Sequence, residues 1–484
     1  MSLFRRYLPL ATLILAIAGL YVYGLSRVGV LSTDEPRYAA IGEAMAQTGD
    51  LITPRLWGAP WFEKPPLLYW MTAAGTAAGL GPEAAARLPV ALLSLAFLGV
   101  TFFLLRREFG AEAAAISTIL LATSAGWIAF SNLGLTDLPL AAFFSLAIWI
   151  ALPLLRGAED GKQLRFALIG VALGLAMLAK GLVPLVLSVP ALWFLRRWWR
   201  NWWLAAVFCL LAAGPWYIAM YLRNGNPFLE DFFWKHHFER LFSASLQHVQ
   251  PWYYYAPVLL CGLFPWTPLF GLLARRHNLW DRRRSFLLAT ASFGFLFFSA
   301  SMNKLPGYLL PLLPALFVLL GACFEQTPLR GLRRWWFLPS ALLIATIPLL
   351  AHALPDVLVA GRISPVHVAP VSATQGFYIA APIAICFLAR RSWTELVLVL
   401  CLIAEGFYIK VKAYPVLDQV VSARGLSREI RALSRKVCDG GINREWVYGL
   451  NFYRGVPLPP CGAGKFDFEL RAEGRNKPSL FRLK

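Results

Sequence analysis

Two adjacent carboxylates, Asp34 and Glu35, open a segment in which apolar residues recur at helical spacing. Such acids are costly to desolvate at a lipid interface, which favours a functional role for at least one of them. The alternative is structural: Thr33 or Asp34 caps the helix, and Pro36 lies in its first turn. The residue types alone leave both interpretations open.

The segment that follows these acids predicts an amphipathic helix. Tyr38, Ile41 and Met45 recur on one face, and Glu43 and Gln47 lie on the other. A helix of this kind is expected to lie on the membrane surface and to position the acids there.

Lys64 is a candidate phosphate contact. It follows Glu63 and precedes Pro65 and Pro66, and a residue before proline is restricted to an extended conformation. An ammonium group on such a stiff stretch suits a fixed contact with a phosphate. The alternative is a lysine whose aliphatic stem covers apolar surface while its charge reaches water.

Asp137 and Lys180 are isolated charges at the edges of apolar blocks. Asp137 lies between Thr136 and a proline-started block, so a helix cap is the structural alternative. Lys180 ends one apolar block and Gly181 opens the next, which places a charge at a tight turn. Interfacial anchoring would explain this lysine equally well.

Two further clusters contain charged residues among aromatic ones. The segment 223–251 predicts an interfacial helix in which Lys235 and Glu239 pair. Its histidines do not follow an established metal-ligand spacing, although a site could be drawn from His236, His237 and His248. The last cluster spans residues 303–308 and includes Lys304 and Tyr308.

The elements that position these residues are membrane spans. The chain is 58% hydrophobic and only 15% charged, which excludes a water-soluble enzyme. Its net charge of +20 is explained by basic residues that flank spans, so no nucleic-acid partner is expected. A span needs about 20 apolar residues. We count thirteen blocks on that criterion, near residues 7–26, 84–105, 111–131, 137–155, 164–180, 181–195, 202–222, 254–274, 285–301, 306–323, 336–352, 372–389 and 393–409.

The basic residues predict the orientation of these spans. Alternate loops carry 20 Lys and Arg residues in one set and 11 in the other. Cytoplasmic loops carry the excess, so the N-terminus is expected in the cytoplasm and the loop 27–83 outside. All the candidate residues then lie on the outer face.

The composition changes after about residue 410. Of the last 75 residues 22 are charged, which predicts a small soluble domain. Residues 422–436 predict a helix and residues 446–453 a strand. An odd number of spans places this domain outside, where Cys438 and Cys461 are expected to form a disulfide.

Several motifs in this order resemble the lipid-linked-sugar glycosyltransferases of the GT-C fold, specifically the bacterial aminoarabinose transferases (ArnT) and their protein O-mannosyltransferase relatives. The resemblance spans roughly residues 25–325. The family more often has Thr where Pro36 stands, which alters the helix entry but not the acids. The motifs are Asp34-Glu35-Pro36-Arg37-Tyr38, Phe62-Glu63-Lys64-Pro65-Pro66-Leu67, Thr136-Asp137-Leu138-Pro139-Leu140, Lys180-Gly181, His237-Phe238-Glu239-Arg240 and Lys304-Leu305-Pro306-Gly307-Tyr308.

The resemblance implies an all-α polytopic membrane protein of GT-C type with a small C-terminal α/β extracytoplasmic domain. The expected domains are 1–409, which includes the catalytic loop 27–83, and 410–484. The implied reaction is inverting transfer of a sugar from a polyprenyl phosphate, expected to be undecaprenyl phosphate, to an acceptor outside the bacterial cytoplasmic membrane.

The same resemblance assigns roles to the candidate residues. Asp34 corresponds to the general base, Asp137 to a second acid, and Lys64 and Arg240 to the phosphate contacts. No cofactor and no metal are carried over, although a metal could be bound by Asp34, Glu35 and Asp137. The remaining candidate substrate contacts are Glu63, Glu35, Lys180, Lys304 and Tyr308.

The acceptor stays open at this point. Lipid A or a related cell-envelope glycolipid is the leading expectation, and a polysaccharide or a protein hydroxyl are alternatives. A flippase that moves a lipid-linked sugar without chemistry is the non-enzymatic alternative.

Overall fold

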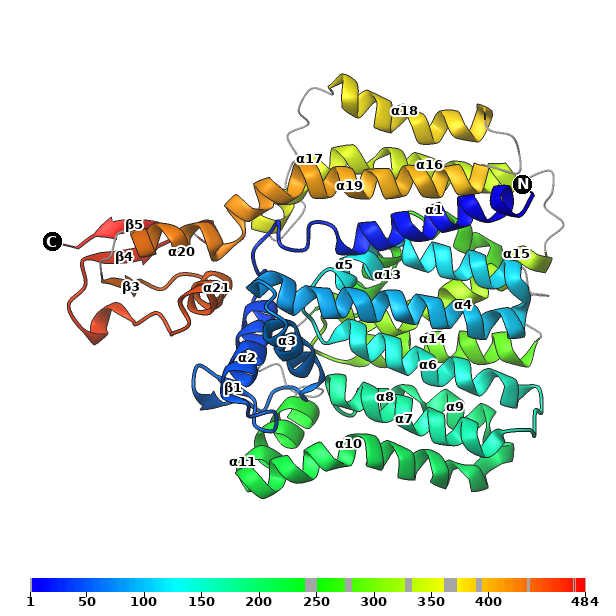
Figure 1. Cartoon of the computed structure of the whole chain (residues 1–484), viewed down its shortest axis with the longest axis horizontal. Helices are drawn as coiled ribbons and strands as arrows, with labels where there is room; N and C mark the ends of the chain where they lie inside the picture. Colours follow the sequence, from blue (N-terminus) through cyan, green and yellow to red (C-terminus); the bar gives the residue numbers. More distant parts are fainter. Residues whose placement is uncertain are drawn as a thin grey trace.

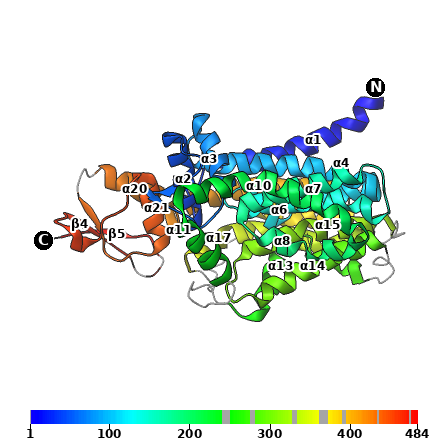
Figure 2. The ribbon, with the colours of Figure 1, turned by 90° about the horizontal axis from the view of Figure 1, so that it is seen from below.

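The computed structural model describes residues 2–239, 250–274, 281–326, 333–360, 372–388, 394–432, 436–472, 474 and 476–483. Most of them form helices whose axes lie side by side in one bundle, with a smaller unit at one end (Figure 1). Figure 2 shows this unit, formed by the last part of the chain, projecting beyond the bundle at the end opposite to the N-terminus.

The first half of the bundle begins with α1 and continues from α4 to α10. Its helices are α1 (Ser2–Val22), α4 (Pro82–Ala122), α5 (Ala125–Ser131), α6 (Asp137–Leu155), α7 (Lys162–Lys180), α8 (Val183–Leu187), α9 (Val189–Phe194), the 3₁₀ turn η1 (Arg196–Asn201) and α10 (Trp202–Asn224). Within α4 the backbone departs from helical geometry at Gly110, where φ is 82°, so α4 holds two of the expected apolar blocks.

The second half of the bundle contains several short helices before the longer α19. These are η3 (Trp252–Tyr254), α13 (Tyr255–Leu263), η4 (Thr267–Ala274), α14 (Arg282–Ala300), η6 (Pro306–Leu312), α15 (Leu313–Gln326), α16 (Arg333–Ala345), α17 (Ile347–Ala360), α18 (Ala373–Leu388) and α19 (Thr394–Val420). Pro339, Pro355 and Pro382 lie inside α16, α17 and α18. Interior prolines remove a backbone donor and bend or interrupt helices, which shortens the regular stretches.

Five helical segments of the described chain are long and apolar enough to cross a membrane, or seven if each of two bent helix pairs counts as one span. Each of the thirteen expected blocks overlaps at least one helix. The chain is therefore a polytopic helical protein, while the number of thirteen spans stays a prediction.

The end of the bundle that carries the richer set of basic loops is tied together by ion pairs. Glu108 accepts from Arg283 at 3.4 Å and lies 3.8 Å from Arg156, and Arg197 lies 3.5 Å from Glu159. Glu108 lies in α4 just before Gly110, Arg156 and Glu159 follow α6, Arg197 lies in η1 after α9, and Arg283 lies in the first turn of α14. The loops assigned to one side by their charge thus meet at one end of the molecule.

The opposite end carries a cover built from the segment between α1 and α4. It consists of α2 (Asp34–Thr48), the hairpin strands β1 (Arg55–Leu56) and β2 (Ala59–Pro60), and α3 (Leu67–Ala77). The amphipathic helix expected here is confirmed, since Tyr38, Ile41 and Met45 are buried. At Gly42 of α2 an added Cβ would lie 2.5 Å from Thr72 of α3, so only glycine allows this close packing.

The segment after α10 forms α11 (Asn226–Leu229) and a π-helical stretch η2 (Glu230–Glu239). Lys235 pairs with Asp231 at 3.2 Å. The pairing that we expected with Glu239 stays a prediction, because the Glu239 side chain lies outside the described part of the chain. An acid four residues N-terminal to a lysine is the better orientation on a helix, and Asp231 occupies that position.

The C-terminal unit combines two helices with a three-stranded sheet of order β3-β4-β5. Strands β3 and β4 are parallel, and β4 and β5 are antiparallel. The expected disulfide between Cys438 and Cys461 is confirmed. The elements are α20 (Ala423–Ala432), β3 (Val437–Asp439), α21 (Arg444–Arg454), the turn η7 (Cys461–Ala463), β4 (Phe468–Arg471) and β5 (Ser479–Arg482).

The strand expected over residues 446–453 is wrong, because this stretch belongs to helix α21. The Asn443 side chain caps the helix by accepting from the Glu445 amide, and Gly455 ends it in a left-handed conformation. Trp446 and Leu450, four residues apart, are buried on one face of the helix. The capping residues and this spacing outweigh the strand preference of the aromatic residues.

The C-terminal unit is fastened to the start of the membrane region. The amide of Val30 donates to the Tyr453 hydroxyl of this unit at 3.0 Å, and the amide of Gly29 donates at 2.8 Å to Asp418, which lies at the end of α19. Arg424 pairs with Asp418 and with Glu83 at the start of α4. The boundary at residue 410 stays a prediction, since α19 is continuous through it to Val420.

Candidate active site

Glu35 and Arg87 form a buried ion pair beneath the cover. Arg87 donates to both carboxylate oxygens, at 2.7 Å and 2.6 Å, and also to the carbonyls of Leu25, Val28 and Gly29. The Glu35 carboxylate also accepts from two backbone amides, those of Leu31 at 2.7 Å and Gly134 at 2.8 Å. Glu35 is only 1% exposed, so this geometry favours a structural role over the contact with substrate that we expected.

Asp34 lies beside this pair but in a more open environment. Its side chain is 33% exposed and accepts from Arg37 and from the Thr33 hydroxyl. The capping alternative is wrong, because neither Thr33 nor Asp34 bonds to the first backbone amides of α2. The Ser32 hydroxyl, which accepts from the Asp34 amide at 3.4 Å, takes part of that role.

A line of alternating charges runs from Asp34 to Lys64. Arg37 contacts Asp34 and also donates to Glu63 at 2.9 Å, and the other carboxylate oxygen of Glu63 lies 3.1 Å from the Lys64 ammonium. Helix α2 supplies Asp34 and Arg37 three residues apart, and the Pro65-Pro66 stretch presents Glu63 and Lys64. The structure thus brings Asp34, Glu63 and Lys64 together, as the motifs predict.

Aromatic rings surround the centre of this line. The Arg37 guanidinium lies 5.4 Å from the Trp61 ring and 5.2 Å from the ring of Tyr448 in the C-terminal unit. Burial lowers the pKa of Arg37, but the carboxylates of Glu63 and Asp34 outweigh it and raise the pKa above its ordinary value. Arg37 therefore stays charged and fixes both acids in space.

Asp137 and Lys180 form a second ionic group at the same end of the bundle. Their side chains meet at 2.5 Å, between the start of α6 and the end of α7. The Lys180 ammonium also lies 4.7 Å from the Tyr308 ring. Thr136 makes no capping bond, and an added Cβ at Gly307 would lie 2.4 Å from Asp137, so η6 packs directly on this carboxylate.

Glu35 links the two ionic groups through the backbone. Glu35 directly follows Asp34, and Gly134, whose amide Glu35 binds, lies three residues before Asp137. The Arg87–Glu35 pair therefore fixes the backbone next to both candidate acids. In Figure 1 the cover and the starts of α4 and α6 lie at the same end of the bundle.

Lys304 is held by carbonyl oxygens. Its ammonium donates to Gln250 at 3.1 Å and to Ser301, and its side chain is buried. The Tyr255 hydroxyl donates to the carbonyl of Leu305 at 3.2 Å and fixes the adjacent backbone. This lysine lies close to the Tyr308 segment in sequence and on the same end of the bundle.

Arg240 and His248 lie outside the described residues, and so do the side chains of His236, His237 and Glu239. Within the residues that the structure describes, no three His, Cys, Asp or Glu side chains are grouped so that they could hold a metal ion. The role of Arg240 therefore stays a prediction, and so does the expectation that no metal is needed.

Sequence reasoning missed three residues at this site. From the sequence, Arg37 is evident only as part of a motif and Arg87 only as a basic residue of a loop. Tyr448 is evident only as part of the wrongly expected strand. The signal for Arg37 was its spacing of three from Asp34 on a predicted helix. Arg87 and Tyr448 gave no local signal, because their partners lie far away in sequence.

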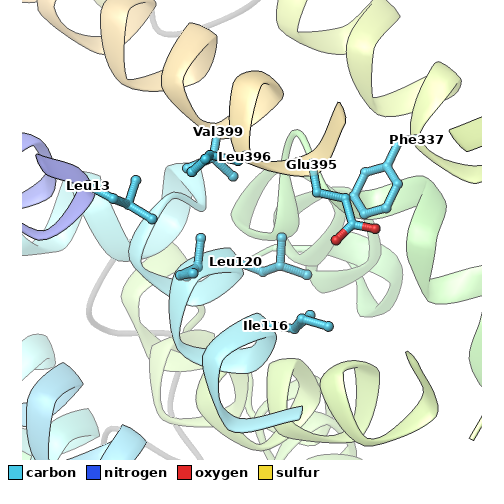
Figure 3. Close-up of a pocket in the computed structure, with 8 residues that line it drawn as sticks. Leu13, Ile116, Leu120, Phe337, Glu395, Leu396 and Val399 are labelled. Atoms are coloured by element: carbon cyan, nitrogen blue, oxygen red, sulfur yellow. The ribbon is translucent and has the colours of Figure 1, made fainter. Parts of the chain in front are cut away.

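A cavity lies away from these ionic groups, between α1, α4, α16 and α19 (Figure 3). Its walls are apolar apart from Glu395, which lies in the first turn of α19. Leu13, Leu120 and Phe337 are among the residues that line it. Apart from that one carboxylate this cavity offers no group for acid–base chemistry.

Comparisons with known proteins identify relatives of the chain. The family model for dolichyl-phosphate-mannose-protein mannosyltransferase matches residues 7–257. Undecaprenyl phosphate-alpha-4-amino-4-deoxy-L-arabinose arabinosyl transferase of Pseudomonas aeruginosa strain UCBPP-PA14 is 32% identical over 330 residues, 65% of this chain and 59% of the relative. The enzyme of that name from Edwardsiella ictaluri is 30% identical over 308 residues, 60% of this chain and 55% of the relative. The matches thus span less than two thirds of these relatives.

Solved structures of similar fold extend the match. The crystal structure of ArnT from Cupriavidus metallidurans bound to undecaprenyl phosphate superposes with a TM-score of 0.72 at 25% identity, over 93% of this chain and 85% of ArnT. The apo structure of the same protein gives 0.72 at 26% identity. These findings confirm the resemblance inferred from the motifs. The chain belongs to the dolichyl-phosphate-mannose-protein mannosyltransferase family.

Proposed function

We propose that the protein is an integral-membrane glycosyltransferase that moves a sugar from undecaprenyl phosphate to an acceptor outside the bacterial cytoplasmic membrane. The leading donor sugar is 4-amino-4-deoxy-arabinose, and the leading acceptor is lipid A or a related glycolipid. The observation that carries this proposal is the line of charges Asp34–Arg37–Glu63–Lys64, which lies at one end of an apolar bundle. The relatives' names and the undecaprenyl phosphate bound to ArnT support the donor.

The reaction assigns a separate task to each end of this line. An acceptor hydroxyl oxygen attacks the anomeric carbon of the sugar, and the bond from that carbon to the phosphate oxygen breaks. Asp34 takes the hydroxyl proton as general base, and undecaprenyl phosphate leaves with the electron pair. Attack opposite to the leaving group inverts the anomeric carbon.

Cations near the leaving group stabilise its developing charge. Lys64 holds the phosphate, together with Arg240 by similarity. In the structure Lys64 lies against Glu63, so donor phosphate competes with that carboxylate for the ammonium. Asp137 acts as a second acid in the pocket, where Lys180 and Tyr308 position it. Lys304, fixed by two carbonyls, adds positive charge nearby.

The membrane arrangement completes the proposal. Thirteen spans place the cover 27–83 and a C-terminal domain 410–484 outside the cytoplasmic membrane. The ion pairs among the opposite loops support a common side for those loops. Thiol labelling tests the arrangement: Asp160→Cys should react with a membrane-impermeant reagent only from the cytoplasm, and Arg55→Cys only from outside. Labelling of Arg55→Cys from the cytoplasm would overturn both the topology and the mechanism.

A transfer assay tests the function directly. Purified protein in lipid nanodiscs is incubated with synthetic undecaprenyl-phosphate sugars and with lipid A, a polysaccharide or an unfolded protein as acceptor. We expect a product with inverted anomeric configuration and release of undecaprenyl phosphate. Transfer to protein alone would favour the O-mannosyltransferase alternative. Movement of donor across vesicles with neither release nor product would identify a flippase instead.

A further inference from the structure

A cavity of about 520 Å³ lies between α2 and the C-terminal unit. One wall is the face of α2 that carries Glu43 and Gln47, the second is the hairpin loop Trp57-Gly58, and the third is the end of α21 with residues 452–457. The cavity opens to solvent, because Gln47, Gly58 and several residues of the third wall are exposed. None of the roles assigned above uses it.

The backbone at Trp57 is unusual for its residue type. The hairpin loop between β1 and β2 has two residues with positive φ, Trp57 at 49° and Gly58 at 87°. Such loops favour Asn or Asp followed by Gly, because a bulky side chain is strained in this conformation. A tryptophan at this position costs stability, and residues held in this way cluster at functional sites.

Two lining residues carry buried donors without a partner. In the described part of the chain neither the Trp57 indole Nε1 nor the Arg454 Nη1 has a hydrogen-bond partner. Glu43 provides an acceptor on the opposite wall, where Gln47 donates to it at 3.3 Å. Buried polar groups are normally paired, so these donors favour a ligand that brings acceptor oxygens.

The cavity is connected to Asp34 by direct contacts. The Trp57 ring stacks on Tyr448 with centroids 5.9 Å apart, and the Tyr448 ring lies 5.2 Å from the Arg37 guanidinium, which pairs with Asp34. The third wall is fixed to the membrane region, because the Tyr453 hydroxyl donates to Glu83 at 2.7 Å. A molecule that contacts Trp57 in this cavity is therefore linked to the candidate base through Tyr448 and Arg37.

We propose that this cavity binds a sugar ring of the acceptor glycan. An aromatic plane suits the apolar face of a pyranose, and a mixture of N–H donors with one carboxylate suits its hydroxyls. The Glu43 carboxylate disfavours a phosphate, and the charged walls disfavour a lipid tail. Describing the sugar as the acceptor rests on the proposed function, whereas binding of a sugar here does not.

Trp57→Asn is the decisive variant, because Asn suits the left-handed turn better than Trp and the hairpin should stay folded. In the transfer assay we expect the KM for acceptor to rise at least tenfold, which corresponds to about 1.4 kcal/mol. The KM for the undecaprenyl-phosphate sugar should stay within twofold. Glu43→Gln should raise the acceptor KM in the same direction. Trp199→Asn, an exposed tryptophan at the other end of the bundle, is the matched control and should change neither value.

A binding measurement separates this inference from the proposed function. Saturation-transfer NMR with methyl glucoside and methyl glucosaminide on the full-length protein in nanodiscs should give a signal that Trp57→Asn removes and Trp199→Asn keeps. A wild-type protein that binds these glycosides but transfers no sugar would refute the function and keep the site. An unchanged signal and an unchanged acceptor KM in Trp57→Asn would overturn the site.

Discussion

Asp34 and Glu35 are neighbours in sequence, yet their carboxylates occupy opposite kinds of environment. Glu35 is 1% exposed and is bound by one arginine and two backbone amides. Asp34 is 33% exposed and is bound by Arg37 and the Thr33 hydroxyl. A carboxylate saturated by donors holds a fold together, whereas one with free access can accept a proton from a substrate. The contrast teaches that the surroundings, rather than the residue type, distinguish a structural carboxylate from a candidate base.

The largest expected effect is on the rate of sugar transfer after a change at Asp34, and it tests the more open of the two acids. We expect Asp34→Asn to lower kcat for transfer by about 10² to 10⁴, because it keeps the shape but removes the base. Arg37 keeps its bond to Glu63 in the variant, so the unfolding midpoint and donor affinity should stay near those of wild type. Near-normal kcat in steady-state transfer assays would return Asp34 to a structural role.

Removing Arg87 addresses the other half of the comparison. Arg87→Ala leaves the Glu35 carboxylate buried without its cation, which typically costs about 3 to 5 kcal/mol. Denaturation curves of the purified protein in detergent should show this loss of unfolding free energy. Arg55→Ala is the control, because Arg55 is 42% exposed and lies 3.9 Å from Asp50. A stability loss no larger than that of the control would show that the pair does not hold the cover in place.

Binding of undecaprenyl phosphate is the next measurement. Lys64→Ala should weaken it by roughly ten- to more than a hundredfold, because charge-assisted contacts contribute about 1.5 to 3 kcal/mol. Arg240→Ala should act in the same direction, and Arg156→Ala in an opposite loop serves as the control. If both variants bind the lipid phosphate as tightly as the control, the phosphate contacts must be sought around Lys180 and Lys304.

The smallest effect concerns Asp50, which ties the cover to α10 through Arg223 at 2.5 Å. Burial raises the pKa of Asp50, but hydrogen bonds from the Thr53 and Ile52 amides and from Arg223 outweigh it and lower that pKa. The folded-state pKa is thus below the unfolded value of about 3.9, so the stabilisation is present above that pH and is lost as the pH falls further. Asp50→Asn should lower the free energy of unfolding by under about 1 kcal/mol at pH 7, since Arg223 is half exposed.

The pH dependence of this variant tests the cause. The difference in thermal unfolding between Asp50→Asn and wild type should shrink below pH 4. A constant difference would show that ionisation of Asp50 is not its cause.

Local spacing predicted the parts of this molecule whose cause is local. The apolar positions 38, 41 and 45 gave the face of α2, and consecutive prolines indicated a stiff Lys64. The α21 helix was mistaken for a strand because aromatic content was weighed above the cap at Asn443 and the stop at Gly455. Those two residues are evident in the sequence and favour a helix over the expected strand.

Other parts of the site depend on residues far apart in the chain. Glu35 meets Arg87 over 52 positions and the Gly134 amide over 99. Tyr448 reaches Arg37 only because the C-terminal unit folds back on the cover. No pattern within one segment contains such information, since it arises from the packing of α2 against α4, the loop before α6 and α21.

The fastening of the C-terminal unit has a mechanical consequence. Asp418, Arg424 and Tyr453 hold the chain at residues 26–30, which ends four residues before Asp34. The C-terminal unit and the start of α2 are therefore mechanically coupled, so that a rotation of one displaces the other. Truncating the chain after α19 would remove more than a peripheral module, because it would also remove the contacts of Arg424 and Tyr453 with residues 26–30 and leave only that of Asp418.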